Sequence, residues 1–325
     1  MAFQLKAKES VGDGIKRNVT RELEKVLDDA AAKPNPQARN EAVHEIRKSL
    51  KKVRAALRLV REELGDDLYR EENWGFRDAA RPLTEVRDAE MLVETFDKLA
   101  PQLVSPIDPG SVTKVRAALL ARQEDVTRRV LDEDRALVGL KQVATRALAR
   151  VSDWRIDGDG WAAVECGVRR VYRAGHRALS LAAGHPSVEN LHEWRKQAKY
   201  LWHQLQLLEP VWVGCEQELG DQVHELTQLL GDDHDLAVLR QVLAADPLTY
   251  GGHHVLKGMF AIVDGQREKL ERQAFALGRQ LYKDPPKGFT SRIEGYWKAW
   301  RDEPTSEPTR HAERARKSRM PLQPQ

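Results

Sequence analysis

Cysteine and strand-forming patterns are both scarce in this chain. Its 325 residues include only two cysteines, Cys166 and Cys215, which show no CxxC or other zinc-binding spacing. Two thiols cannot form the disulfide framework of a small secreted protein, so we expect free thiols in a reducing compartment. Alternation of β-branched and polar residues is rare, whereas Ala, Leu, Glu, Arg, Lys and Gln dominate. This composition disfavours a β-rich fold and favours helices.

Long apolar runs are also missing. The chain contains no stretch of about 18 apolar residues that could span a bilayer. Its first ten residues, MAFQLKAKES, lack the apolar segment of a signal peptide. We therefore expect a cytoplasmic protein that has no membrane partner.

Charge of one sign is not in excess. Charged residues make up 32% of the chain, but the net charge is only +3. A strong positive field can therefore arise only where basic residues are concentrated and acidic residues lie elsewhere.

Helical periodicity covers almost the whole sequence. Proline and glycine clusters separate the periodic segments, as in PNP at 34–36 and DGDG at 157–160. The predicted helices cover about 10–32, 41–64, 70–98, 111–150, 160–183, 187–209, 216–245, 252–282 and 287–302. The predicted fold class is therefore all-α, built from antiparallel hairpins. Residues 303–325 are rich in proline and charge, so we expect a disordered basic tail.

An internal repeat organises the chain into two parts. HEIRKSLK at 44–51 and HEWRKQAK at 192–199 share the pattern His-Glu-x-Arg-Lys-x-x-Lys. GIKR and GVRR precede the two copies, and FRDAARPLTEVRDAEML and VHELTQLLGDDHDLAVL follow them in the same order. We therefore predict two similar helical halves, about 1–150 and about 158–302.

Each repeated helix carries a basic stripe beside its apolar seam. Apolar residues from Val43 to Leu64 follow spacings of three and four, which is typical of a core-facing seam. One residue corresponds to about 100° of helix rotation, so the residues that follow the seam positions form a parallel stripe. In the first helix these residues are His44, Arg47, Lys51, Arg54, Arg58 and Arg61. In the second helix the stripe begins with His192, Arg195 and Lys199.

Like charges at this spacing repel each other, so the stripes need acidic neighbours or an anionic ligand. Acidic residues that could neutralise them are Asp78, Asp88, Glu225 and Asp235. The basic residues outnumber these acids, which favours a polyanion site. We interpret Asp88 and Asp235 as residues that hold basic side chains in place. The helices before each stripe add Arg17 and, at helical spacing, Arg170, Arg173 and Arg177.

The chain resembles the conserved histidine α-helical domain (CHAD) family. The resemblance rests on His44-x-x-Arg47-Lys48-x-x-Lys51-x-x-Arg54, on His192-x-x-Arg195-Lys196-x-x-Lys199, and on the pairs Arg87-Asp88 and His234-Asp235. It covers the chain from about residue 3 to residue 302. It implies two four-helix bundles related by a pseudo-twofold axis, with a basic groove or pore between them. It also implies binding of inorganic polyphosphate and association with polyphosphate granules.

Polyphosphate also suits the residue types. It is a linear anion that offers only phosphate oxygens, to which arginine donates paired hydrogen bonds and lysine supplies adaptable point charges. The predicted binding residues are Arg17, His44, Arg47, Lys48, Lys51, Lys52, Arg54, Arg58, Arg170, Arg173, Arg177, His192, Arg195, Lys196 and Lys199. Next to these cations the histidine pKa should fall, leaving both motif histidines neutral. Trp202 replaces a basic residue of the motif, and we interpret it as a packing residue.

Three other functions stay open on sequence grounds. A basic groove also attracts nucleic acid, which we expect to be a weaker competitor because aromatic residues do not alternate with the cations. GDDHDL at 231–236 could belong to a metal-dependent phosphohydrolase, but Arg87 takes the place of His234 in the other half. We therefore expect a binding module without catalytic residues, metal or cofactor. The stripes could instead be paired internally in a helical scaffold.

Overall fold

The computed structural model of the chain describes residues 2–31, 35–103, 107–212 and 217–302. Every regular element in these ranges is a helix, so the all-α prediction is confirmed. None of the described helices is both long and apolar enough to cross a membrane. Cys215 and the predicted tail at 303–325 lie outside the described residues.

The described residues of the first half form seven α-helices. They are α1 (Val11–Asp29), α2 (Pro36–Leu59), α3 (Arg61–Leu64), α4 (Asp66–Ala80), α5 (Pro82–Leu103), α6 (Pro109–Thr127) and α7 (Ala136–Arg150). Local sequence explains their starts: Ser10 accepts a hydrogen bond from the Asp13 amide before α1, and Asn35 does the same for the Ala38 amide before α2. Such side chains satisfy amides that a helix leaves without partners.

The described residues of the second half form five α-helices, and the longest described helix, α11, is among them. They are α8 (Ala162–Gly184), α9 (Val188–Leu207), α10 (Gln217–Ala245), α11 (Gly252–Leu281) and α12 (Pro286–Asp302). A short 3-10 helix, Val151–Asp153, lies between α7 and α8, and another, Glu209–Val211, lies between α9 and α10.

Three of the predicted helices are interrupted, and the sequence prediction was wrong there. The segment 41–64 breaks at Val60, which separates α2 from α3. The segment 70–98 breaks before Pro82, which begins α5 because proline has no amide hydrogen to continue the preceding helix. The segment 111–150 passes through a π-helix, Arg128–Glu133, and then through Arg135 in the left-handed conformation with φ of 50°. Neither proline nor glycine marks the break at the π-helix.

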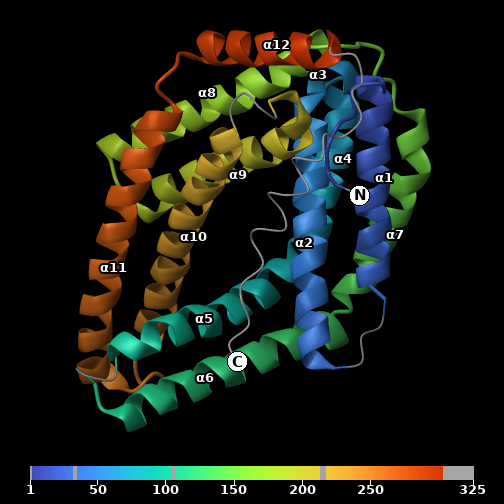
Figure 1. Cartoon of the computed structure of the whole chain (residues 1–325). Helices are drawn as coiled ribbons and strands as arrows, with labels where there is room; N and C mark the ends of the chain where they lie inside the picture. The colour runs from blue at the N-terminus through green and yellow to red at the C-terminus, as the bar shows by residue number, and fades with distance from the viewer. Residues whose placement is uncertain (1, 32–34, 104–106, 213–216, 303–325) are drawn as a thin grey trace, which may run out of the picture.

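Two apolar clusters hold the helices together. The main core joins α1, α2 and α7 to α8, α9, α10 and α12, and its fully buried members include Ile46 and Trp194. The distal core joins the end of α5 and α6 to the end of α10 and α11, around Phe96, Leu239 and Met259. In Figure 1, α5 and α6 cross from the side of α1, α2, α4 and α7 to reach α10 and α11. The chain therefore forms a ring of helices that is closed at two places.

The repeated helices meet each other in the fold. α2 packs on α9, and α5 packs on α10, so each basic helix contacts its counterpart. α8 approaches α2 so closely that a Cβ atom on Gly167 would lie 2.0 Å from the carbonyl oxygen of Leu59. The pseudo-twofold relation between the halves stays a prediction.

Candidate functional site

Helices α2, α5, α9 and α10 surround a cavity of about 700 Å³, which we call the basic cavity. Both predicted stripes contribute to it. Its basic and histidine wall residues are His44, Arg47, Lys48, Lys51, Arg87, Lys98, His192, Arg195, Lys199, His203, His224 and His234. The acidic wall residues are Asp88, Asp232 and Asp235. The fold therefore brings seven of the predicted binding residues together: His44, Arg47, Lys48, Lys51, His192, Arg195 and Lys199.

The lysines at the centre of the two stripes lack acidic partners. Within the described residues, the side chains of Lys51 and Lys199 make no hydrogen bond and have no carboxylate oxygen within 4.0 Å. Arg47 donates a hydrogen bond to Thr84 Oγ1 at 2.6 Å, and Arg195 lies 4.0 Å from Asp235. The cavity thus contains more positive charge than its own carboxylates neutralise.

Burial and mutual repulsion destabilise the protonated form of both lysines. Burial lowers the pKa of Lys51 well below its usual value, and the charge of Lys199 lowers it further. Burial lowers the pKa of Lys199 to about 8, with Arg195 as the next cause. A nearby anion stabilises the charged form of such lysines and so offsets the solvation that they lose on burial.

The two predicted supporting acids lie inside helices α5 and α10 and face the same cavity. Burial raises the pKa of Asp88, and the nearby charges of Arg47 and Arg195 oppose the rise. Burial also raises the pKa of Asp235, which approaches Arg195 at 4.0 Å. Within the described residues, Asp88 forms no ion pair within 4.0 Å, so its influence on the cations is through space.

The cavity histidines are neutral near pH 7. Burial, followed by Arg87, lowers the pKa of His44, and burial, followed by Arg195, lowers the pKa of His192. The His192 ring lies 4.4 Å from the ring of His234, whose pKa falls to about 4. The expected direction of the shift is correct for both motif histidines, but burial contributes more than the neighbouring cations.

The basic surface continues from the cavity into a smaller pocket of about 180 Å³. Arg47, Lys51 and Thr84 line both spaces, and Arg54, Arg77 and Arg81 line only the smaller one. Arg54 is held there by a 3.1 Å hydrogen bond to Asn73. A linear anion could therefore extend from the cavity along α2 toward α4.

Several predicted residues of the stripe helices are engaged locally. Lys48 lines the cavity but pairs with Glu45 at 3.1 Å, and Lys196 pairs with Glu193. Lys52 lies 3.7 Å from the fully buried Glu22. Arg58 stacks over the ring of Tyr200, 3.9 Å from its centre. Lys52, Arg58 and Lys196 do not line the basic cavity.

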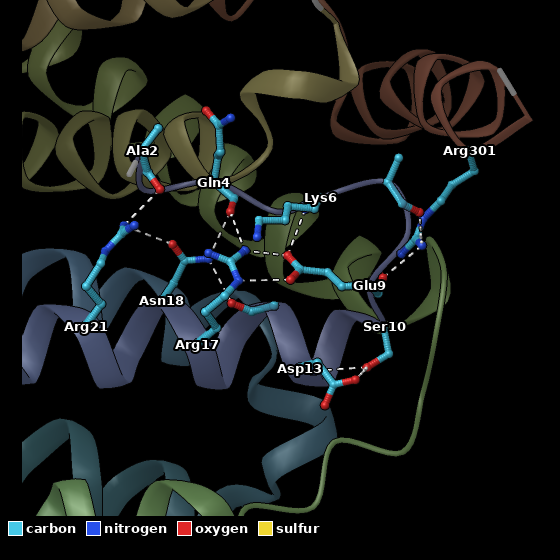
Figure 2. A network of polar contacts seen from close by, with 12 residues as sticks. Ala2, Gln4, Lys6, Glu9, Ser10, Asp13, Arg17, Asn18, Arg21 and Arg301 are labelled. Atoms are coloured by element: carbon cyan, nitrogen blue, oxygen red, sulfur yellow. Dashed lines mark hydrogen bonds and ion pairs between the residues drawn. The ribbon is translucent and has the colours of Figure 1, made fainter. Parts of the chain in front are cut away.

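Arg17 lies away from the cavity and fastens the N-terminal segment. Figure 2 shows its guanidinium bonded to Glu9, at 2.9 Å from Nε, and to the Gln4 carbonyl oxygen at 2.9 Å. Arg301 of α12 binds the same segment through the carbonyl oxygens of Ala7 and Glu9. The position of Arg17 therefore matches a structural role.

The basic residues of α8 face other surroundings. Arg170 pairs with Glu62, and Arg173 and Arg177 are exposed. Arg173 borders a separate pocket of about 500 Å³ with Arg169 and Lys287. None of the three predicted α8 residues lines the basic cavity.

The sequence interpretation missed part of the wall contributed by α5 and α10. Arg87 lines the cavity while its Nη1 contacts Glu90 at 2.5 Å and Glu94 at 3.0 Å. His224 stacks on Trp202 with ring centres 4.4 Å apart, so Trp202 both packs and lines the cavity. His224, Gln228, Gly231 and His234 share one helical face, and their spacing was the signal that could have revealed them.

The acidic motif GDDHDL does not gather around one point. Asp233 is buried and binds Arg267 at 2.9 Å, whereas Asp235 faces the cavity. No group of three or more His, Cys, Asp or Glu residues in the described ranges could hold a metal ion.

Fold and site together define a helical protein with a cation-lined cavity, and comparisons with known proteins show its family. The sequence profile of the CHAD domain matches residues 21–244. This match covers more than half of the chain, which therefore belongs to the CHAD domain family. None of the curated proteins matches the chain significantly. The crystal structure of the CHAD domain from the plant Ricinus communis is similar over 92% of this chain and 95% of that chain, with a TM-score of 0.55 and 16% identity.

Proposed function

We propose that this protein binds inorganic polyphosphate in the basic cavity. The observation that carries the proposal is the convergence of Arg47, Lys51 and Lys199, from two helices, without a carboxylate ion pair among the described residues. A string of phosphates would supply the negative charge that the wall lacks. Such binding suits a protein that targets or organises polyphosphate granules.

The energetics favour a ligand with many charges. The free protein bears the cost of burying ammonium groups near guanidinium groups, which is why the lysine pKa values are low. Phosphate oxygens remove that cost by accepting charge-assisted hydrogen bonds from several cations together. A polyanion can also continue into the smaller basic pocket past Arg54.

Single-stranded nucleic acid fits this wall less well. Its binders usually present aromatic faces on which bases stack. Trp202 is the aromatic residue of the cavity wall, and its ring is already stacked on His224. We therefore propose that nucleic acid competes only weakly, and that the protein binds its ligand without transforming it.

The decisive experiment removes the two central charges. We expect the double variant K51Q/K199Q to lose about 100-fold in affinity for polyphosphate of defined length, because two charge-assisted interactions of about 1.5 kcal/mol each are lost. Isothermal titration calorimetry measures this change. The matched control K114Q/K269Q removes two exposed lysines from α6 and α11 and should bind as the unmodified chain does.

Folding and selectivity need their own measurements. Circular dichroism should show that K51Q/K199Q melts no lower than the unmodified chain, since it removes buried charges that lack partners. Equal affinities for the cavity variant and the control would refute a site in the basic cavity. An oligonucleotide that short polyphosphate cannot displace at equal charge concentration would instead favour nucleic acid. Phosphate release with added Mn²⁺ that depends on Asp235 would identify an enzyme.

A further inference from the structure

The amine of Lys199 is accessible from the basic cavity and has no partner within the protein. Lys199 lies in the cavity wall on α9, four residues after Arg195, and residues at this spacing share one face of a helix. Among the described residues, its side chain makes no hydrogen bond and no ion pair within 4.0 Å. Unlike Arg195 Nε, which is enclosed and has no partner, Lys199 Nζ keeps accessible surface in the cavity. This nitrogen can therefore meet a molecule that enters.

The surroundings of Lys199 also keep much of its amine neutral. Burial is the largest cause that lowers its pKa to about 8, and the charge of Arg195 is the next. At pH 7.5 roughly a quarter of such amines are unprotonated, compared with about 0.1% for a lysine of ordinary pKa near 10.4. A desolvated lysine beside other cations is an activated nitrogen nucleophile. Lys199 therefore combines access to the cavity with chemical reactivity.

The neighbours of Lys199 select an electrophile that carries a phosphate group. Arg47 of α2 is fixed by its 2.6 Å hydrogen bond to Thr84 Oγ1. The guanidinium of Arg195 lies against α10, with Nε 3.5 Å from the place that a Cβ atom on Gly231 would occupy. Guanidinium groups donate paired hydrogen bonds to phosphate oxygens. A phosphate bound by these two arginines would hold its attached group close to the amine, which raises the rate of reaction.

We propose that Lys199 is a site of covalent acylation by acyl phosphates, whose phosphate group Arg47 and Arg195 hold. The neutral amine attacks the carbonyl carbon of the acyl phosphate, and a C–N bond forms. The bond between this carbon and the phosphate oxygen breaks, and the phosphate leaves with the electron pair. The leaving phosphate takes up the proton that the nitrogen loses. The products are an uncharged amide on Lys199 and hydrogen phosphate.

Acylation would regulate the basic cavity. The reaction itself does not require that the cavity binds polyphosphate, whereas its effect on affinity rests on the proposed function. The amide removes one of the two central charges, so the acylated protein should bind polyphosphate about tenfold more weakly, the effect of about one charge-assisted interaction. Polyphosphate already in the cavity should in turn shield Lys199 from the acyl donor.

The first test incubates the full chain with acetyl phosphate at pH 7.5 and follows each lysine by peptide mass spectrometry. We expect Lys199 to be acetylated about tenfold faster than Lys114 and Lys269, the exposed lysines of α6 and α11. The larger neutral fraction of its amine favours this, and its lower basicity offsets only part of the advantage. Equal rates at the three lysines, or acetylation of Lys51 in place of Lys199, would overturn the assignment.

A second test separates guidance by the arginines from the reactivity of the amine. N-acetoxysuccinimide is an uncharged acetyl donor, so the preference for Lys199 over Lys114 should be several-fold smaller with it than with acetyl phosphate. R195Q should remove this difference between the donors, whereas R122Q, which changes an exposed arginine of α6, should keep it. The same preference with both donors in the unmodified chain would contradict a phosphate held by Arg47 and Arg195.

Addition of short polyphosphate distinguishes the two proposals. Polyphosphate that slows the acetylation of Lys199 and leaves that of Lys114 unchanged would support both. Selective acetylation that polyphosphate does not slow would support the acylation site and contradict polyphosphate binding in the basic cavity. Polyphosphate binding without selective acetylation would contradict the acylation site alone.

Discussion

Lys199 gives the protein a pH dependence that can be assigned to one side chain. Its folded-state pKa is about 8, whereas an unfolded lysine titrates near 10.4. Between these values the unfolded chain binds more protons, so stability should rise with pH over that window. Burial is the largest cause of this shift; Arg195, Arg47 and Arg87 lower the pKa further, and Asp235 opposes them. Lys51 repels the same ammonium group.

The measurement is the difference in free energy of unfolding between the unmodified chain and K199Q, followed by urea melts from pH 7 to 10. We expect the free energy of unfolding of the unmodified chain to rise relative to that of K199Q as pH rises. The same comparison with K114Q should show no such trend. A constant difference would mean that Lys199 has an ordinary pKa. If polyphosphate binds here as proposed, it stabilises the ammonium form of Lys199, so its affinity should fall over the same pH range.

The charge of Arg87 is already neutralised by neighbouring acids. Arg87 lines the basic cavity, but it forms ion pairs with Glu90 and Glu94 of its own helix, α5. The variant E90Q/E94Q should release its charge and strengthen polyphosphate binding about tenfold, the effect of about one charge-assisted interaction. Calorimetric titration checks this, with E24Q/E218Q as the control for a general loss of negative charge. Unchanged affinity in E90Q/E94Q would show that Arg87 does not reach the ligand.

At the scale of elements, the sequence predicted which helices exist better than where they break. The seam and the stripe of α2 were readable because one period runs from Val43 to Leu64, across the break at Val60 that separates α2 from α3. The interruption at Pro82 had a local signal, whereas the π-helix before Arg135 had none. Val130 and Leu131 of this segment are buried in the main core, so packing, and not a local residue pattern, accounts for the break.

The same limit applies to the candidate site. The motif positions predicted the cavity-facing cations of α2 and α9, because the face of a helix follows from its spacing. Spacing within a helix does not reveal that Glu9 captures Arg17 or that Glu62 of α3 captures Arg170. Those ion pairs join separate segments, so only the folded chain determines which basic residues stay available.

Gly167 tests how closely α8 and α2 must approach. G167A would place a methyl carbon 2.0 Å from the backbone oxygen of Leu59, and a backbone atom cannot move aside as a flexible side chain can. We expect a loss of about 2 kcal/mol or more in the free energy of unfolding, as in other overpacked sites. G139A in α7 has open space around the new methyl group and should stabilise by about 0.5–1 kcal/mol. Chemical denaturation compares the two, and equal effects would show that the helices can separate without cost.

At the scale of the whole molecule, the arrangement of charge matters more than its total. A net charge of only +3 coexists with a cavity wall in which cations outnumber acids. If Arg47, Lys51, Arg195 and Lys199 each neutralise one phosphate, log affinity should fall with log salt concentration with a slope of roughly −3, at about 0.7 per contact for a single-stranded polyanion. Titrations at several salt concentrations measure this slope. A slope near zero would mean that ion release does not drive binding.

The two apolar clusters that hold the helices together do not include the cations that line the basic cavity. The lining and the scaffold are therefore separable parts of one molecule. A designer could replace the cations of α2 and α9 with glutamates and leave both seams untouched. The result would be a container of the same shape for polycations such as oligolysine.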